Sequence, residues 1–195
     1  LMQFIPLEKR VITIEDSLEI HYSEINPDAD AVELRVGEDF SYTDAIKACL
    51  RQNPMWLGLS EAGSVEVTSL IEQWSTGVNG ITTIHLDDLR KLPDRIENMM
   101  NDVNDASRLE NRIYRYVNVG VLIRREKEAD GGIRRYIDQM CFYVREEHKN
   151  RVYMLVEDGE IISRKIPADI AKRLKLAGID EFFWCDLDPF IKRGM

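Results

Sequence analysis

The sequence has few cysteines and histidines, and it has no long apolar stretch. Its three cysteines, Cys49, Cys141 and Cys185, lie far apart in a chain of 195 residues and form no CxxC pair. An odd number of scattered cysteines argues against a disulfide framework and indicates reduced thiols. The three histidines do not cluster near them, which argues against a zinc site. No apolar run approaches the roughly 20 residues that a membrane-spanning helix needs.

Basic side chains are scarce in the first half of the chain. Residues 1–105 carry 20 acidic and 8 basic side chains, a balance of −12, and the rest carry 15 acidic and 18 basic, a balance of +3. Nucleic-acid binding depends on phosphate neutralisation by Lys and Arg. We therefore expect no strong direct binding of nucleic acid.

The order of apolar segments predicts an α/β fold. The composition, 44% hydrophobic and 31% charged, allows one packed domain, or one with a small appendage. Strand-like and helix-like patterns alternate as far as residue 123, which predicts a mostly parallel sheet flanked by helices. The expected strands are 10–14, 32–36, 56–59, 81–84 and 117–123, and the expected helices are 42–52, with Ser41 as N-cap, 65–74 and 88–100.

The pattern changes after Gly131 and Gly132. Residues 133–144 and 151–157 predict an antiparallel hairpin, and residues 168–177 predict a helix that Gly178 stops. We therefore predict a first domain over residues 1–128 and a small hairpin-and-helix appendage over 129–195. The aromatic residues 182–184 are expected to pack back onto the appendage.

Polar residues follow three of the expected parallel strands. Glu15 and Asp16 follow the first, with Glu19 one turn later; Glu61 follows the strand 56–59, and His85 follows 81–84. Open α/β sheets place active sites at the carboxyl ends of their strands. Taken singly, each acid is more often a helix cap or loop residue, and a single histidine is more often structural. Three such strand ends in one chain favour a site.

These segments resemble the boxes of secretion-type traffic ATPases, the motors of type II and type IV secretion, pilus assembly and conjugation. Residues 11–19 (VITIEDSLE) resemble the aspartate box of that family. Residues 50–61, together with Glu66, are similar to its Walker B segment, and 76–85 are similar to its histidine box. The helix that begins near Pro93 also fits, and the four segments occur in the family's order over roughly residues 3–100.

Four positions depart from the family pattern and mark a divergent branch. They are Met55, where the family usually has Asp, Ser60 and Gly63 around the Walker B glutamate, and Val78 at the first histidine of the histidine box. The sequence of residues 15–19 (EDSLE) is closer to that of the conjugation and tight-adherence branch than to that of the type II branch. The family's phosphate loop, G-x-x-x-x-G-K-[ST], does not occur in this sequence. We expect a cropped chain that begins just after that loop and does not hydrolyse ATP alone.

The resemblance implies a RecA-like fold, ATP and Mg²⁺ as cofactors, and roles for particular residues. Glu15 would polarise or orient the attacking water, Glu61 would hold Mg²⁺ or share the base role, and His85 would sense the γ-phosphate. Additional nucleotide-site candidates are Arg51, Arg95, Asp16 and Glu19. For the two arginines a surface ion pair is the competing interpretation, and the two acids could simply cap the next segment.

The resemblance also implies partners and a location. It implies a homo-hexameric ring, contact with inner-membrane secretion or pilus platform proteins, and a position at the cytoplasmic face of a bacterial membrane. Two rival functions stay open. One is a non-enzymatic interaction module on a degenerate RecA fold, and the other is a nucleic-acid-binding regulator, which the acidic first half disfavours.

Overall fold

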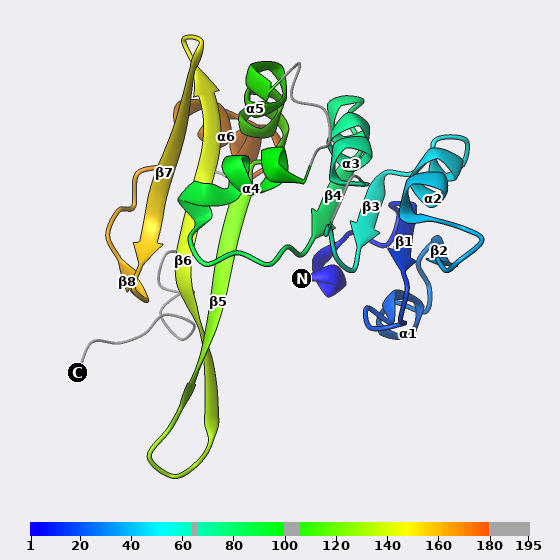
Figure 1. Cartoon of the computed structure of the whole chain (residues 1–195), viewed down its shortest axis with the longest axis horizontal. Coiled ribbons are helices and arrows are strands. Elements are labelled where there is room, and N and C mark those ends of the chain that lie inside the picture. The colour runs from blue at the N-terminus through cyan, green and yellow to red at the C-terminus, as the bar shows by residue number, and fades with distance from the viewer. Residues whose placement is uncertain (64–65, 100–105, 180–195) are drawn as a thin grey trace. The chain divides into compact units, whose positions relative to one another are not determined.

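The computed structural model describes residues 1–63, 66–99 and 106–179, and these form two compact units. The first unit is built mainly on Leu1–His85, and the second on Leu86–Glu97 and the described residues from 106 onward. Each unit has its own four-stranded sheet (Figure 1). Among the described residues, no helix is both long and apolar enough to cross a bilayer.

The first unit is a parallel sheet with helices, as the sequence predicts. Its strands have the order β2-β1-β3-β4 and all pair in parallel. β1 is buried along its whole length, as expected for a strand covered on both faces. In chain order the elements are η1 (Met2–Phe4), β1 (Val11–Glu15), α1 (Tyr22–Ile25), β2 (Ala31–Arg35), α2 (Tyr42–Cys49), β3 (Trp56–Leu59), α3 (Glu66–Ser75) and β4 (Asn79–Thr82).

Local sequence signals mark the start of α2 and the end of α3. Ser41 caps α2, because its side chain accepts a hydrogen bond from the backbone N–H of Asp44. Gly77 follows α3 with a φ of 100°, a conformation that glycine adopts without steric cost. Apolar side chains of both helices pack on the sheet in one buried cluster, which includes Ile12, Ile14, Ile46, Leu57 and Leu70.

The second unit is an antiparallel sheet with the order β5-β6-β7-β8. A buried cluster joins strand residues Phe142 and Leu155 to Ile170 of α6. The elements are η2 (Leu89–Lys91), α4 (Leu92–Asn98), α5 (Ala106–Tyr116), β5 (Val119–Lys127), β6 (Ile133–Glu146), β7 (Lys149–Glu157), β8 (Glu160–Ile161) and α6 (Ala168–Leu176).

The structure corrects one strand assignment and adds two helices. The segment expected at 117–123 as part of the parallel sheet is β5, which pairs antiparallel with β6. That prediction was wrong because an apolar alternating segment fits either kind of sheet, and its partner is chosen by tertiary contacts. The hairpin of β6 and β7 is confirmed. The sequence predictions missed α1, α5 and the two-residue strand β8, and residues 182–184 lie outside the described residues. The domain boundary at residue 128 stays a prediction.

Candidate functional site

Three candidate residues lie at the carboxyl edge of the parallel sheet. Glu15 is the last residue of β1, Glu61 comes two residues after β3, and His85 comes three residues after β4. β3 pairs in parallel with both β1 and β4, so these strands end at the same edge. The fold therefore brings together three positions that are up to 70 residues apart in the sequence.

Glu61 and His85 approach each other at this edge. The Glu61 Oε1 and His85 Nε2 atoms are 3.5 Å apart, and their side chains are 50% and 88% exposed, respectively. The backbone below them is fixed by two hydrogen bonds of Thr83, whose hydroxyl donates to the Ser60 carbonyl at 2.5 Å and whose carbonyl accepts from Ala62 N–H at 2.8 Å. An exposed pair of this kind adds little stability. Both side chains are therefore open to a ligand.

The carboxylate of Glu15 is buried and partly engaged. Its Oε2 atom accepts hydrogen bonds from the backbone N–H groups of Glu19 and Ile20, both at 2.8 Å. Its Oε1 atom is also buried and has no hydrogen-bond partner among the described residues. Buried polar atoms normally have partners. One oxygen of Glu15 therefore holds the loop that follows β1, and the other remains an acceptor for a further donor.

Tyr42 connects the ends of β1 and β3, and the sequence reading did not single it out. Its hydroxyl accepts from the backbone N–H of Asp16 at 3.2 Å and shares a hydrogen bond of 2.9 Å with the hydroxyl of Ser60. Burial raises the pKa of Tyr42, so this hydroxyl keeps its proton at neutral pH. The sequence did contain a signal that could have identified Tyr42. Ser41 caps a helix that follows β2, which places the first helical residue at the carboxyl edge.

Glu66 supports the segment that carries Glu61. It lies in the first turn of α3, is 8% exposed, and accepts a hydrogen bond from the backbone N–H of Gly63 at 2.7 Å. This contact links α3 to the loop after β3. Glu66 therefore holds the backbone next to Glu61 in place.

The remaining candidates are not all at this edge. Asp16 and Glu19 are exposed and follow β1 there. Arg51 is exposed and lies between α2 and β3, where the chain enters the amino edge of the sheet, so the structure does not bring it to Glu15 and Glu61. Arg95 is an exposed residue of α4 in the second unit.

Comparison with known proteins settles the family. The sequence profile of the type II/IV secretion system proteins matches residues 1–124, which is more than half of the chain. The chain belongs to this family. An uncharacterised protein of Bacillus anthracis is 34% identical over 128 residues, which is 64% of this chain and 29% of that protein.

Solved structures of secretion and pilus ATPases share the fold. The VirB11 ATPase of the Brucella suis type IV secretion system is 23% identical, with a TM-score of 0.60, 72% of this chain and 42% of that chain covered. DotB of Legionella pneumophila is 18% identical, with a TM-score of 0.59 over 72% and 38%. The pilus retraction motor PilT, solved with bound ADP, is 22% identical, with a TM-score of 0.57 over 67% and 38%. The chain thus spans about two fifths or less of the length of these relatives.

A magnesium site in this member of the type II/IV secretion family would have few protein ligands. Among the described residues, no three His, Cys, Asp or Glu side chains gather as a metal-binding group. Mg²⁺ keeps several waters and takes one or two carboxylates plus phosphate oxygens in nucleotide sites. The exposed carboxylate of Glu61 fits such a role. The free oxygen of Glu15 fits a hydrogen bond to a water.

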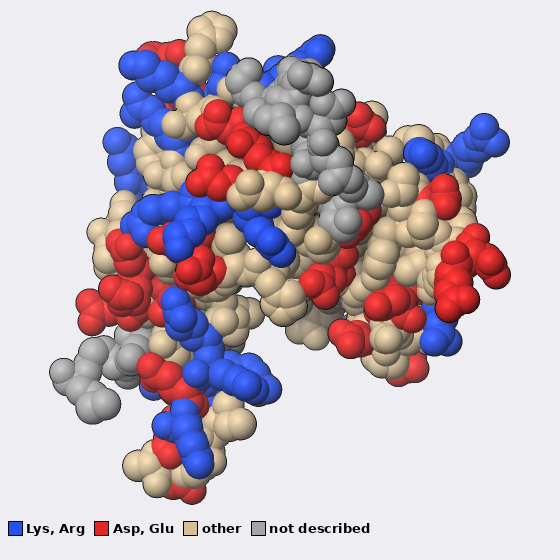
Figure 2. Space-filling model, in the orientation of Figure 1, with Lys and Arg blue, Asp and Glu red and all other residues tan. Residues whose placement is uncertain are grey.

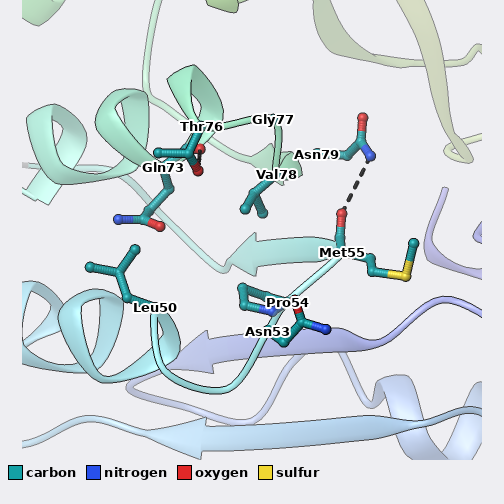
Figure 3. A pocket seen from close by; sticks show the side chains of 9 residues that line it. All are labelled: Leu50, Asn53, Pro54, Met55, Gln73, Thr76, Gly77, Val78 and Asn79. Atoms are coloured by element: carbon teal, nitrogen blue, oxygen red, sulfur yellow. Dashed lines mark hydrogen bonds between the residues drawn. The ribbon is translucent and has the colours of Figure 1, made fainter.

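A pocket of about 330 Å³ lies away from these residues, beside the segments that enter β3 and β4 (Figure 3). None of the nine described residues that line it is charged, so it offers no cation to a phosphate. The buried Oε1 atom of Gln73 has no partner there. The lining residues are Leu50, Asn53, Pro54, Met55, Gln73, Thr76, Gly77, Val78 and Asn79.

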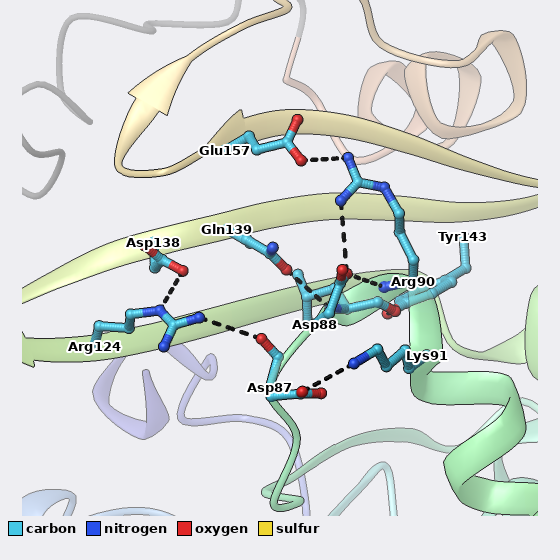
Figure 4. Close-up of polar contacts among 10 residues, drawn as sticks. Asp87, Asp88, Arg90, Lys91, Arg124, Asp138, Gln139, Tyr143 and Glu157 are labelled. Carbon is cyan, nitrogen blue, oxygen red and sulfur yellow. Dashed lines mark hydrogen bonds and ion pairs between the residues drawn. The ribbon is translucent and has the colours of Figure 1, made fainter.

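The polar contacts of the second unit hold η2 on its sheet (Figure 4). Leu89 donates its backbone N–H to Gln139 at 2.9 Å, and its carbonyl accepts from the Tyr143 hydroxyl at 2.6 Å. Arg124 pairs with Asp138 at 2.5 Å and also donates to the backbone of Asp87 at 3.3 Å. These groups satisfy one another. The cluster therefore has a structural explanation and is not a candidate site.

Proposed function

We propose that this chain is part of a motor ATPase that couples ATP hydrolysis to the export of protein, pilin or DNA. The observation that carries the proposal is the arrangement of Glu15, Glu61 and His85 at one carboxyl edge of a parallel sheet, in a chain of the type II/IV secretion family. Support also comes from the fold it shares with PilT, whose structure holds ADP.

The proposed roles follow from how each side chain is held. The buried Glu15 has one oxygen fixed by two N–H groups and one free to orient the attacking water. Glu61, half exposed, holds Mg²⁺ through its water shell or shares the base role with Glu15. His85, beside Glu61, senses the γ-phosphate. Bound Mg²⁺ would neutralise developing phosphate charge.

The other candidates keep secondary proposed roles. Asp16 and Glu19 lie at the same edge and border the nucleotide. Arg51, which lies at the amino edge of the sheet, contacts a neighbouring subunit, and Arg95 stabilises charge or makes such a contact. The proposed assembly is a homo-hexameric ring at the cytoplasmic face of a bacterial membrane, in contact with secretion or pilus platform proteins.

The central experiment uses the longer protein that contains this chain together with a phosphate loop. Glu15→Gln and Glu61→Gln keep side-chain size and remove charge, so we expect hydrolysis to fall roughly 100-fold or more while ATP affinity is preserved. Glu8→Gln is the matched control, because Glu8 precedes β1 and its side chain is 70% exposed. Unchanged hydrolysis in both test variants would show that the carboxylates are wrongly assigned.

Two further measurements separate the alternatives. We expect the 195-residue chain alone to show no Mg²⁺-dependent turnover above its Glu61→Gln variant, because the backbone and Lys of a phosphate loop supply most phosphate binding. We expect His85→Ala to reduce transport more than hydrolysis, whereas a packing role would lower only the melting temperature. If the longer protein does not hydrolyse ATP at all, the non-enzymatic interaction module becomes the better account.

A further inference from the structure

The hairpin of β5 and β6 presents a face whose positive charges are unmatched. Directly opposite residues in the register are Ile123 and Ile137, Arg125 and Arg135, and Lys127 and Ile133. Side chains of opposite residues share a face, and alternate residues of a strand share it too. We call this surface the ribbon face and define it by its exposed members, Ile123, Arg125, Lys127, Ile133 and Arg135.

The two faces of this hairpin differ in how their charges are balanced. On the other face Arg124 pairs with Asp138, and Tyr136 donates to Glu126 at 3.0 Å. On the ribbon face, no acid among the described residues forms an ion pair with Arg125, Lys127 or Arg135. Figure 2 shows Lys and Arg side chains along this hairpin, with Asp and Glu side chains among them.

Placing two arginines opposite each other destabilises the hairpin itself. Arg125 and Lys127 are two residues apart, about 7 Å along a strand, which is less than the Debye length of about 8 Å at physiological salt. The three cations therefore act as one charged surface. Ile123 and Ile133 are 64% and 58% exposed beside them, so the surface is apolar as well as cationic. It suits a partner that offers carboxylates next to an apolar side chain.

The turn of the hairpin argues against a continuous anionic partner. Glu128 and Asp130 lie in the turn, next to the cations. A nucleic-acid backbone or an anionic lipid surface would face these two acids as well as the arginines, and like charges repel. A protein surface with discrete carboxylates can avoid them.

The chain carries such a surface at the carboxyl edge of its own parallel sheet. Leu18 is 51% exposed and lies between exposed Asp16 and Glu19, while exposed Glu38 and Asp39 follow the neighbouring strand β2. We call these five residues the acidic lip. Arg35 Nε donates to the backbone oxygen of Asp16 and not to these carboxylates. The first half of the chain has a balance of −12 against +3 in the second, which favours head-to-tail contact between copies.

We propose that the ribbon face of one copy docks on the acidic lip of a second copy. The contact joins two different surfaces, so it is heterologous and builds rings or filaments. It rests on the proposed self-association and names the surfaces that form it. It does not depend on ATP hydrolysis.

The test is sedimentation velocity of the 195-residue chain at low and high salt, without nucleotide. We expect association at low salt that weakens at high salt, and about tenfold or more weaker association in Arg125→Glu/Arg135→Glu. The matched control is Lys172→Glu/Lys175→Glu, which makes the same charge change on exposed residues of α6 and should leave association unchanged.

Mixing two variants with opposite charge reversals shows whether either has lost association only because it is poorly folded. Glu38→Lys/Asp39→Lys should also fail to associate alone, and mixing it with Arg125→Glu/Arg135→Glu should restore association. A wild-type chain that stays monomeric at low salt overturns the proposal. Unchanged association in the Arg125→Glu/Arg135→Glu variant also overturns the proposal. Binding to duplex DNA or to anionic vesicles, with the chain alone remaining monomeric, overturns it as well. These outcomes leave the proposed ATPase role untouched, because no hydrolysis is measured.

Discussion

The two units differ in where they leave polar side chains unsatisfied. In the parallel unit, Glu61 and His85 are exposed at the carboxyl edge and Glu15 keeps one buried oxygen without a partner. In the antiparallel unit, the large buried polar groups around η2 satisfy one another, as Tyr143 and Leu89 do. Parallel strands all end at the same edge, so the loops that carry chemistry meet there. Antiparallel strands alternate in direction, so their loops are shared between two edges.

The largest expected effects come from the two cores, and they test whether the units are independent. Ile46 and Leu155 are fully buried in separate clusters. Truncating either to Ala should lower the free energy of unfolding by about 2–5 kcal/mol. Leu50→Ala is the control, because Leu50 is 51% exposed and its loss should cost less than about 0.5 kcal/mol.

Cysteine labelling during denaturant unfolding can assign each loss to one unit. Cys49 belongs to the first unit and Cys141 to the second, and both are buried. In a Cys185→Ser background, we expect Ile46→Ala to expose Cys49 at lower denaturant and to leave Cys141 unaffected, and the reverse for Leu155→Ala. Equal shifts of both cysteines in either variant would mean that the units unfold as one.

A smaller effect compares one tyrosine hydroxyl in each unit. Tyr143→Phe removes the donor to the Leu89 carbonyl and should cost about 1–3 kcal/mol, because Tyr143 is 1% exposed and its partner is left unsatisfied. Tyr42→Phe removes contacts in a half-buried site and should cost about 0.5–1.5 kcal/mol. Urea unfolding measures both. If Tyr42→Phe costs more, the edge of the parallel unit is more tightly held than its exposure indicates.

A comparably small effect per side chain appears at alkaline pH. Burial raises the pKa of Cys49 and of Cys141 from 9.0 to about 11. A raised folded-state pKa gives stability that is present below pH 9 and is lost as pH rises toward 11. We expect the free energy of unfolding to fall by about 1 kcal/mol per cysteine by pH 10. Urea unfolding at pH 8 and pH 10 checks this, and Cys49→Ala or Cys141→Ala should remove its share. If the free energy of unfolding falls as much between pH 8 and pH 10 in both variants as in the wild-type chain, the prediction is wrong.

Much of the first unit could be predicted because its signals are local. The run that forms β1 is apolar throughout, and Ser41 caps α2 by contacting a residue three positions away. The missed elements lack such signals. α1 has four residues, and His21 before it has a positive φ of 50°. β5 could not be assigned to its sheet, because its partner residues on β6 are chosen across the chain.

By itself, the sequence determined the family, the order of the strands that Glu15, Glu61 and His85 follow, and the uneven charge of the two halves. Those properties depend on residue identity and on short-range spacing. The sequence placed the end of β4 at Ile84, two residues beyond the end at Thr82 in the structure. Only the tertiary structure decided that Glu15 is buried and gives one oxygen to the loop after β1, that Tyr42 joins two strand ends, and that Arg125 faces Arg135. Each of these depends on strand pairing or on the burial of a side chain, and both are settled by contacts between residues far apart in the sequence.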